Sequence, residues 1–135
     1  MYDVRDMKDI TPSEYFIDHR ITPKVGRKGM GVFARYPISK NEIIEYSPIS
    51  GCFREPWNNT PESLKHIVFS FPNNSDTYVI GLGYLSLYNH DDNNNSVWTT
   101  TDDGLYITAI RDIESGEELC VNYGDAYWSG GWPKL

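Results

Sequence analysis

The chain has 135 residues, enough for one domain with a modest core, and its 23% charged and 14% aromatic residues exclude a disordered composition. Its formal net charge of -7 argues against nucleic-acid binding as a main role, because an acidic surface repels a phosphate backbone. The same charge favours a basic partner, although solubility alone would also account for it. The start, MYDVRDMKDI, lacks the apolar segment of a signal peptide, and no run could span a membrane. We therefore expect an intracellular, soluble protein.

Short runs rich in β-branched or aromatic residues predict strands and make the chain mainly β. These runs span residues 31–34, 43–49, 77–80, 105–110 and 118–123. One helix is predicted in TPESLKHIVF, residues 60–69, where Thr60 can cap the first turn and Pro61 fits the first helical position.

Two segments share a pattern that predicts two similar turns, each leading into a strand. They read ISKNEII (38–44) and IESGEEL (113–119), with Asn41 and Gly116 at the positions suited to positive φ. The two cysteines, Cys52 and Cys120, are too few for a structural zinc site, although one disulfide between them is compatible with the sequence.

The first candidate functional segment is KGMGVFA, residues 28–34. Its paired glycines, Gly29 and Gly31, either let the backbone approach a ligand closely or simply form a tight turn. It is not a dinucleotide fingerprint, because the third glycine and the following helix are missing, and no Gly-Lys-Ser/Thr of a phosphate loop follows.

The second candidate is LYNHDDNNN, residues 87–95, in which Asn89-His90 precede a highly polar loop. A surface turn, a metal loop and a ligand pocket are all compatible with this pattern. Asp91, Asn93 and Asn95 have the spacing of the first calcium-loop ligands, with Asp102 at the twelfth position. However, a serine stands where that loop requires glycine, and no His/Cys/Asp cluster supports zinc or iron.

The third candidate is EELCVNYGDAYW, residues 117–128, where a predicted strand ends in Asn122-Tyr123-Gly124. A tyrosine before a glycine turn can present its hydroxyl at a strand end, or it can be a half-buried core residue. The residues of this segment alone favour the core interpretation.

Taken in this order, the three segments resemble the SET-domain protein lysine methyltransferases. That family has a Gly-x-Gly, then Asn-His-Ser-Cys-x-Pro-Asn, then Gly-Glu-Glu-Leu-x-x-Asp-Tyr-Gly. The matching segments here are residues 29–31, 89–95 and 116–124. The similarity covers about residues 24–128 of a single domain, 1–135. The compact chain and its ending Gly-Asp-Ala-Tyr-Trp look most like the minimal SET proteins of large algal viruses.

The resemblance implies a SET fold of several short sheets, with one or two short helices and a C-terminal pseudoknot. It implies an S-adenosylmethionine-dependent enzyme that methylates lysine in a protein or basic peptide, with histone tails as one candidate and a nuclear location in that case. By resemblance, the cofactor-binding residues would be Lys28, Gly29, Met30, Gly31, Asn89, His90, Tyr123 and Trp128. Tyr123 would be the catalytic tyrosine, and Tyr84, Tyr127 and Val121 would line the substrate channel.

Further expectations follow from the resemblance and from the sequence itself. The resemblance is compatible with a homodimer, and the charge, the lack of a long apolar run and the lack of a ligand cluster predict no direct contact with nucleic acid, no membrane and no metal. The alternative is a SET fold that has lost catalysis and binds a peptide or protein.

Several positions depart from the family pattern. Asp91-Asp92 replace Ser-Cys, Asn94 replaces Pro, and Asn122 replaces the usual Asp. Val121 stands where many members carry the Phe or Tyr that tunes how many methyl groups are added. The central-helix tyrosine of many relatives is also missing, so a second channel tyrosine would come from Tyr78 or Tyr84, or be absent.

Overall fold

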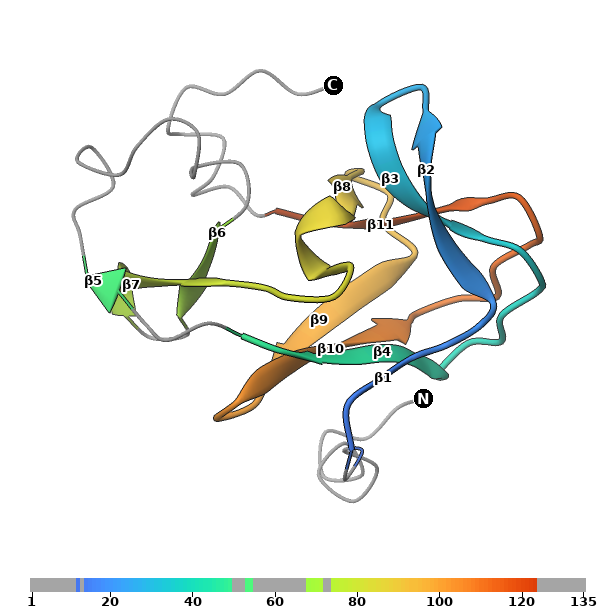
Figure 1. Cartoon of the computed structure of the whole chain (residues 1–135). Coiled ribbons are helices and arrows are strands. Elements are labelled where there is room, and N and C mark those ends of the chain that lie inside the picture. The colour runs from blue at the N-terminus through green and yellow to red at the C-terminus, as the bar shows by residue number, and fades with distance from the viewer. Residues whose placement is uncertain (1–11, 13, 50–52, 55–67, 72–73, 124–135) are drawn as a thin grey trace.

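The chain forms three small β-sheets in a computed structural model that describes residues 12, 14–49, 53–54, 68–71 and 74–123 (Figure 1). The first sheet has the order β1 (Phe16–Ile17), β4 (Ile43–Pro48), β10 (Gly104–Ala109) and β9 (Ser96–Thr100). The second has the order β2 (Ile21–Gly26), β3 (Gly29–Ala34), β11 (Glu118–Val121) and β8 (Asn89–His90). The third has the order β5 (Phe53–Arg54), β7 (Asn74–Ile80) and β6 (Val68–Phe71).

The predicted mainly β fold is confirmed, and each of the five predicted runs contains or overlaps a strand. The helix predicted at residues 60–69 lies mostly outside the described residues. Its last two residues, Val68 and Phe69, begin strand β6, where they pair with Ile80 and Val79 of β7. For these two residues the helix prediction was wrong. In the part of the chain that the structure describes, the one helical element is the 3-10 turn η2 (Leu85–Leu87), and no helix is long and apolar enough to cross a membrane.

The hydrophobic core lies between the first two sheets. All six residues of β10 are buried, because this strand is flanked by β4 and β9. Val32 of β3, Ile44 of β4 and Leu119 of β11 are 0% exposed, and they belong to one continuous apolar cluster. Burial of such side chains is the main contribution that stabilises a small β domain.

The two predicted turns are confirmed, and they lie side by side. Asn41 has φ 76° and Gly116 has φ 88°, which are left-handed conformations that Asn and Gly adopt most readily. Just before each turn, Ile38 and Ile113 exchange two backbone hydrogen bonds, of 2.9 and 2.8 Å. The repeated pattern therefore builds a paired turn that leads into β4 and β11.

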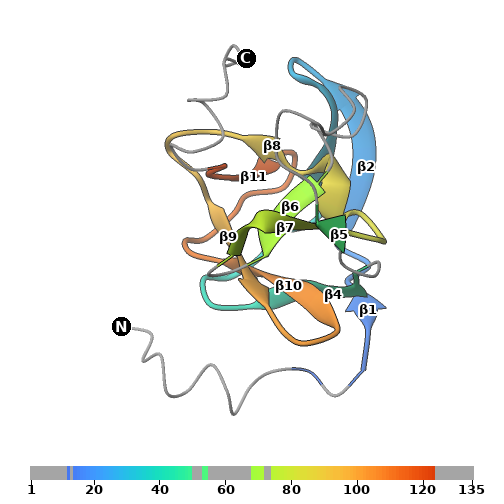
Figure 2. The ribbon, with the colours of Figure 1, turned by 90° about the vertical axis from the view of Figure 1, so that its left-hand side faces the viewer.

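The second sheet brings the three candidate segments together. β11 pairs antiparallel with β3 on one side, through Leu119 and Val32, and parallel with β8 on the other. In the parallel pair, Asn89 lies opposite Cys120 and His90 opposite Val121. Figures 1 and 2 both show β8 beside β11, the arrangement that the predicted pseudoknot requires.

Candidate functional site

Asn89 connects the Gly-x-Gly segment with the terminal segment. Its amide nitrogen donates to the carbonyl oxygen of Met30 over 3.0 Å and to the carboxylate of Glu118 over 2.8 Å. A Cβ at Gly31 would lie 2.3 Å from Oε2 of Glu118 and 3.0 Å from Nδ2 of Asn89. A side chain at Gly31 would displace these two groups from their present positions, so the glycine pair serves a close approach as well as a turn.

Gly29 contributes a different property to the same segment. It has φ 91°, and a Cβ there would meet no described atom within 4 Å. Among the described residues, the backbone at Gly29 is therefore open. The side chain of Met30, between the two glycines, is about half exposed.

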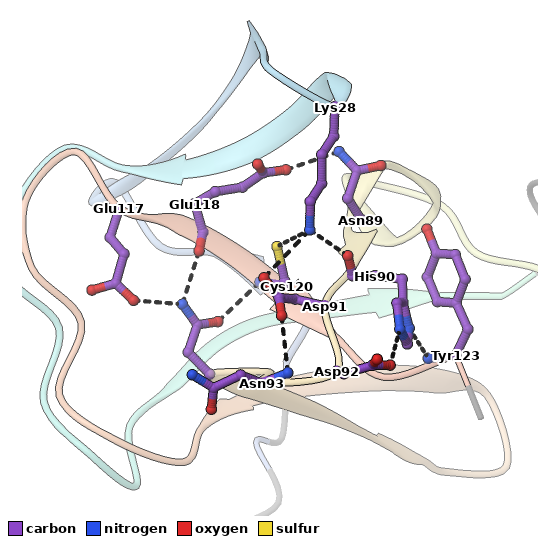
Figure 3. A network of polar contacts seen from close by, with 11 residues as sticks. Lys28, Asn89, His90, Asp91, Asp92, Asn93, Glu117, Glu118, Cys120 and Tyr123 are labelled. Atoms are coloured by element: carbon purple, nitrogen blue, oxygen red, sulfur yellow. Dashed lines mark hydrogen bonds and ion pairs between the residues drawn. The ribbon is translucent and has the colours of Figure 1, made fainter. Parts of the chain in front are cut away.

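Lys28 ties the turn between β2 and β3 to the loop after β8. Its ammonium group donates to the carbonyl oxygen of His90 and lies 3.4 Å from Oδ2 of Asp91 (Figure 3). The backbone N–H of Asn93 and the Lys28 charge hold the pKa of Asp91 below its ordinary value. Lys28 also lies 4.0 Å from Sγ of Cys120, a free thiol whose pKa burial raises to about 11. The observed role of Lys28 is to brace this loop, and its contact with a cofactor stays a prediction.

Asn95 joins the polar loop to β11. The sequence analysis did not predict this structural role. Its side-chain nitrogen donates to the backbone carbonyl of Glu118 over 2.8 Å and to the carboxylate of Glu117 over 2.9 Å. Its side-chain oxygen accepts from the backbone N–H of Cys120 over 2.9 Å. Asn95 is 2% exposed, so these bonds are shielded from water. Its place as the last residue of the Asn-His motif was the signal available in the sequence.

Two of the residues at calcium-loop spacing, Asp91 and Asn95, have partners within the protein. The side chain of Asn95 is engaged with β11, while Asp91 faces Lys28 and accepts from the backbone N–H of Asn93 over 2.9 Å. Across the described residues, no group of three or more His, Cys, Asp or Glu side chains could hold a metal ion.

His90 and Tyr123 form the centre of the site. The backbone N–H of Tyr123 donates to Nδ1 of His90 over 2.9 Å, and the two rings lie 5.2 Å apart between centroids. Nε2 of His90 lies 2.7 Å from Oδ1 of Asp92. The Tyr123 hydroxyl donates to the backbone carbonyl of Tyr88 over 2.9 Å. The Tyr123 residue is thus held through its backbone N–H and through its hydroxyl. Figure 3 shows the first of these contacts, with the Tyr123 ring beside His90.

Of the four remaining predicted site residues, two pack in the hydrophobic core and two lie outside the described residues. Tyr84 directly precedes η2, and its side chain packs against the hydrophobic core, as that of Tyr123 does. Val121 is 2% exposed and belongs to the same core. Tyr127 and Trp128 lie outside the described residues. The channel roles of Tyr84, Val121 and Tyr127, and the cofactor role of Trp128, stay predictions.

A model of the SET domain matches residues 29–124 of this chain. The chain belongs to the SET-domain family. The matched range begins at the Gly-x-Gly of this SET domain and ends just after Tyr123, so it contains all three segments that meet in the second sheet.

Two curated proteins illustrate the similarity of this SET domain to known sequences. A histone-lysine N-methyltransferase of Schizosaccharomyces pombe, described as H3 lysine-37 specific, is 34% identical over 106 residues, which are 76% of this chain and 71% of that protein. The histone-lysine N-methyltransferase SET9 of Gibberella zeae is 34% identical over 100 residues, which are 72% of this chain and 15% of that protein. The chain therefore spans only a small part of the second relative.

Two solved structures have the same fold as this SET domain. A Plasmodium falciparum protein, described as a candidate histone methyltransferase, has a TM-score of 0.65 at 26% identity and covers 83% of this chain and 99% of its own. A Chaetomium thermophilum Polycomb Repressive Complex 2, bound to an inhibitor, has a TM-score of 0.65 at 22% identity, over 82% of this chain and 15% of its own. The second similarity concerns the fold alone.

Proposed function

We propose that this SET domain is a protein lysine methyltransferase that uses S-adenosylmethionine, and that one domain spans residues 1–135 with its core at about 24–128. The observation that carries the proposal is the meeting of three distant segments around one point. Asn89 contacts Met30 through its amide, and His90 contacts Tyr123 through its ring. The named relatives, which are histone-lysine N-methyltransferases, support the same reaction.

The residues at this point fit the amino-acid part of the cofactor. Asn89 gives its amide N–H groups to Met30 and Glu118, so the side-chain oxygen is the atom that can serve a ligand. A carbonyl oxygen suits the ammonium group of an amino acid. The backbone at Gly29, one residue before the Met30 carbonyl that Asn89 contacts, meets no described atom where a Cβ would lie. By family resemblance, Lys28, Gly31, Met30, His90 and Trp128 would complete the binding site.

Methyl transfer demands alignment more than acid-base chemistry. When bound, the cofactor supplies an electrophilic methyl group on a sulfonium. The substrate lysine must lose its proton first, because its ordinary pKa is about 10.4. Aromatic and apolar walls lower that pKa by desolvation, which is the role proposed for Tyr84, Tyr127 and Val121.

Tyr123 is the proposed catalytic residue. Its hydroxyl proton is donated to the carbonyl of Tyr88, so the hydroxyl oxygen can accept a hydrogen bond from the substrate amine. An amine held in this way keeps its lone pair directed along the line of attack. Tyr123 therefore orients the nucleophile rather than removing its proton.

A histone tail is the substrate class that we favour, together with a nuclear location, because the named relatives act on histones. The net charge of -7 supports a basic peptide. Methylation of a Lys/Arg-rich peptide should then weaken with added salt, mainly through a higher KM, and a neutral peptide should respond much less. Equal salt responses would contradict the electrostatic part of the proposal. The viral-type subclass, the homodimer and the absence of nucleic-acid contact stay predictions.

The test uses the full chain with radiolabelled S-adenosylmethionine, recombinant histones and a cell lysate, followed by mass spectrometry of the labelled proteins. We expect label on lysine with the wild type and at least about tenfold slower turnover with Tyr123→Phe, which removes one hydroxyl. Tyr36→Phe is the matched control, because Tyr36 is 57% exposed. Cofactor and peptide binding without any turnover would instead support the inactive binding module.

A further inference from the structure

A buried carboxylate, which has no part in the chemistry described so far, is hydrogen-bonded to Tyr88, the residue whose carbonyl accepts from the Tyr123 hydroxyl. Glu45, in the middle of β4, is 0% exposed. A buried carboxylate is costly unless donors satisfy its oxygens. Glu45 accepts three hydrogen bonds: from the Ser47 hydroxyl over 2.7 Å, the Tyr84 backbone N–H over 2.8 Å and the Tyr88 hydroxyl over 2.7 Å.

The chain is shaped locally to deliver these donors. Gly83, with φ 60°, lets the turn before η2 come close to the carboxylate, since a Cβ there would lie 2.5 Å from Oε2 of Glu45 and 2.3 Å from Oγ of Ser47. Burial raises the pKa of Glu45, and the three donors oppose that rise. Burial and the neighbouring carboxyl also raise the pKa of Tyr88, so its hydroxyl stays protonated and donates.

Tyr88 joins this buried cluster to Tyr123. Its hydroxyl is held by Glu45, and its backbone carbonyl accepts the hydrogen bond from the Tyr123 hydroxyl over 2.9 Å. The Tyr88 residue is only 3% exposed, and it is the residue immediately before the Asn-His pair. A side chain anchored at its tip restricts the backbone that carries it. The Tyr88 carbonyl accepts the hydrogen bond from the Tyr123 hydroxyl. Its position therefore depends on the Glu45–Tyr88 hydrogen bond.

We propose that Glu45, acting through Tyr88, is a positioning residue for the hydroxyl of Tyr123. The inference rests on the proposed function, because it assigns Glu45 a part in the turnover that Tyr123 performs. The competing explanation is that the cluster only stabilises the fold. The two explanations differ in one respect: positioning acts through the Tyr123 hydroxyl, and fold stabilisation does not.

The first experiment compares Tyr88→Phe with Tyr46→Phe in the full chain, and combines each with Tyr123→Phe. Tyr88→Phe removes the link to Glu45 and keeps the ring. Tyr46→Phe is the matched control: it deletes a hydroxyl bonded to Thr101 over 2.9 Å, next to Glu45 on the same strand. We expect Tyr88→Phe to lower kcat about fivefold to tenfold with KM changed less than about twofold, and Tyr46→Phe to have little effect.

The double variants decide between positioning and stabilisation. In the Tyr123→Phe background, Tyr88→Phe should lower kcat by no more than about twofold further, because the hydroxyl that it positions is already gone. An equal loss in both backgrounds would overturn the proposal. Glu45→Gln is the second variant, in case Tyr88→Phe does not fold, because an amide cannot accept all three hydrogen bonds. Glu45→Gln should likewise lower kcat in the wild type and have little further effect on kcat in the Tyr123→Phe background.

A second readout needs no turnover. With tyrosine labelled by carbon-13 at Cζ, the Tyr123 signal is assigned as the one that disappears in Tyr123→Phe. We expect Tyr88→Phe and Glu45→Gln to shift this signal, and Tyr46→Phe to leave it in place. An unchanged Tyr123 signal in both cluster variants would overturn the positioning role. A wild type with no activity would instead contradict the proposed function, so the two failures are distinguishable.

Discussion

The backbone N–H of Tyr123 donates a hydrogen bond to Nδ1 of His90 over 2.9 Å. An acceptor nitrogen carries no proton, so this contact places the ring proton on Nε2, which lies 2.7 Å from Oδ1 of Asp92. The imidazole thus bridges the terminal segment and the polar loop. Its neighbour Asn89 contacts Met30, so the Asn-His pair holds two other segments at once.

This geometry predicts that the two amide replacements of His90 will differ. Asn can offer an acceptor where Nδ1 lies, whereas Gln offers its polar atoms nearer the position of Nε2. His90→Asn should therefore keep the hydrogen bond from Tyr123, and its kcat should exceed that of His90→Gln by about tenfold, equivalent to one hydrogen bond to a buried N–H. Steady-state kinetics with both variants make the comparison. Equal kcat values, or a faster His90→Gln, would contradict the assigned contact.

A second prediction concerns the stability of the loop that Asn95 closes. Asn95→Ala would leave the Cys120 N–H and the Glu118 carbonyl without this partner in a buried setting. We expect the free energy of unfolding to fall by about 2–4 kcal/mol, measured by urea denaturation. The matched control is Asn94→Ala, which removes one hydrogen bond, to the carbonyl of Ser96, from a half-buried residue. A loss for Asn95→Ala no greater than that of the control would count against this role.

The resemblance of the three segments to the family pattern was sufficient to predict that they meet, and the pairing of β11 with β3 and β8 agrees with it. The burial and the contacts of individual side chains were not predictable in the same way. Glu45 has the appearance of a surface residue in a strand, but β4 lies between β1 and β10 and its inner four residues are all buried. The capping residue Thr60 and Pro61 suggested a helix over residues 60–69, whereas Val68 and Phe69 pair with β7 instead. Tertiary pairing determines such cases, and local sequence does not report it.

A third prediction concerns acid stability. Arg20 donates to Asp18 over 3.0 Å and to Glu42 over 2.8 Å. These side-chain hydrogen bonds hold the pKa of both carboxyls below their ordinary values, 3.8 for Asp18 and 4.5 for Glu42. A carboxyl with a lowered pKa in the folded state stabilises the fold above its ordinary pKa, and this stabilisation is lost as the pH falls through the folded-state value.

Arg20→Gln should therefore be less stable than the wild type at neutral pH, and the difference should shrink as the pH falls below 3.8. Thermal unfolding across a pH series measures this difference. Arg35→Gln is the control, since Arg35 donates to the hydroxyl of Thr22 and not to a carboxylate. A difference that stays constant down to the lowest pH would show that Arg20 acts by packing and not by its charge.

The last prediction tests the close approach at Gly31. A methyl group there would lie 2.3 Å from Oε2 of Glu118 and 3.0 Å from Nδ2 of Asn89, so the two side chains must shift, and we expect their hydrogen bond to weaken. Asn89 would then be held less firmly by the acceptor that helps to orient its amide. We expect Gly31→Ala to weaken S-adenosylmethionine binding by about tenfold or more while the core strands stay folded, because Gly31 itself brings no side chain to the core. Calorimetry measures the affinity, and circular dichroism checks the fold.

Val25→Ala is the matched control. Val25 lies on β2 opposite Met30 and is 71% exposed, so its replacement should leave the affinity unchanged. Full affinity in a folded Gly31→Ala protein would mean that the Asn89–Glu118 contact has no part in holding the cofactor.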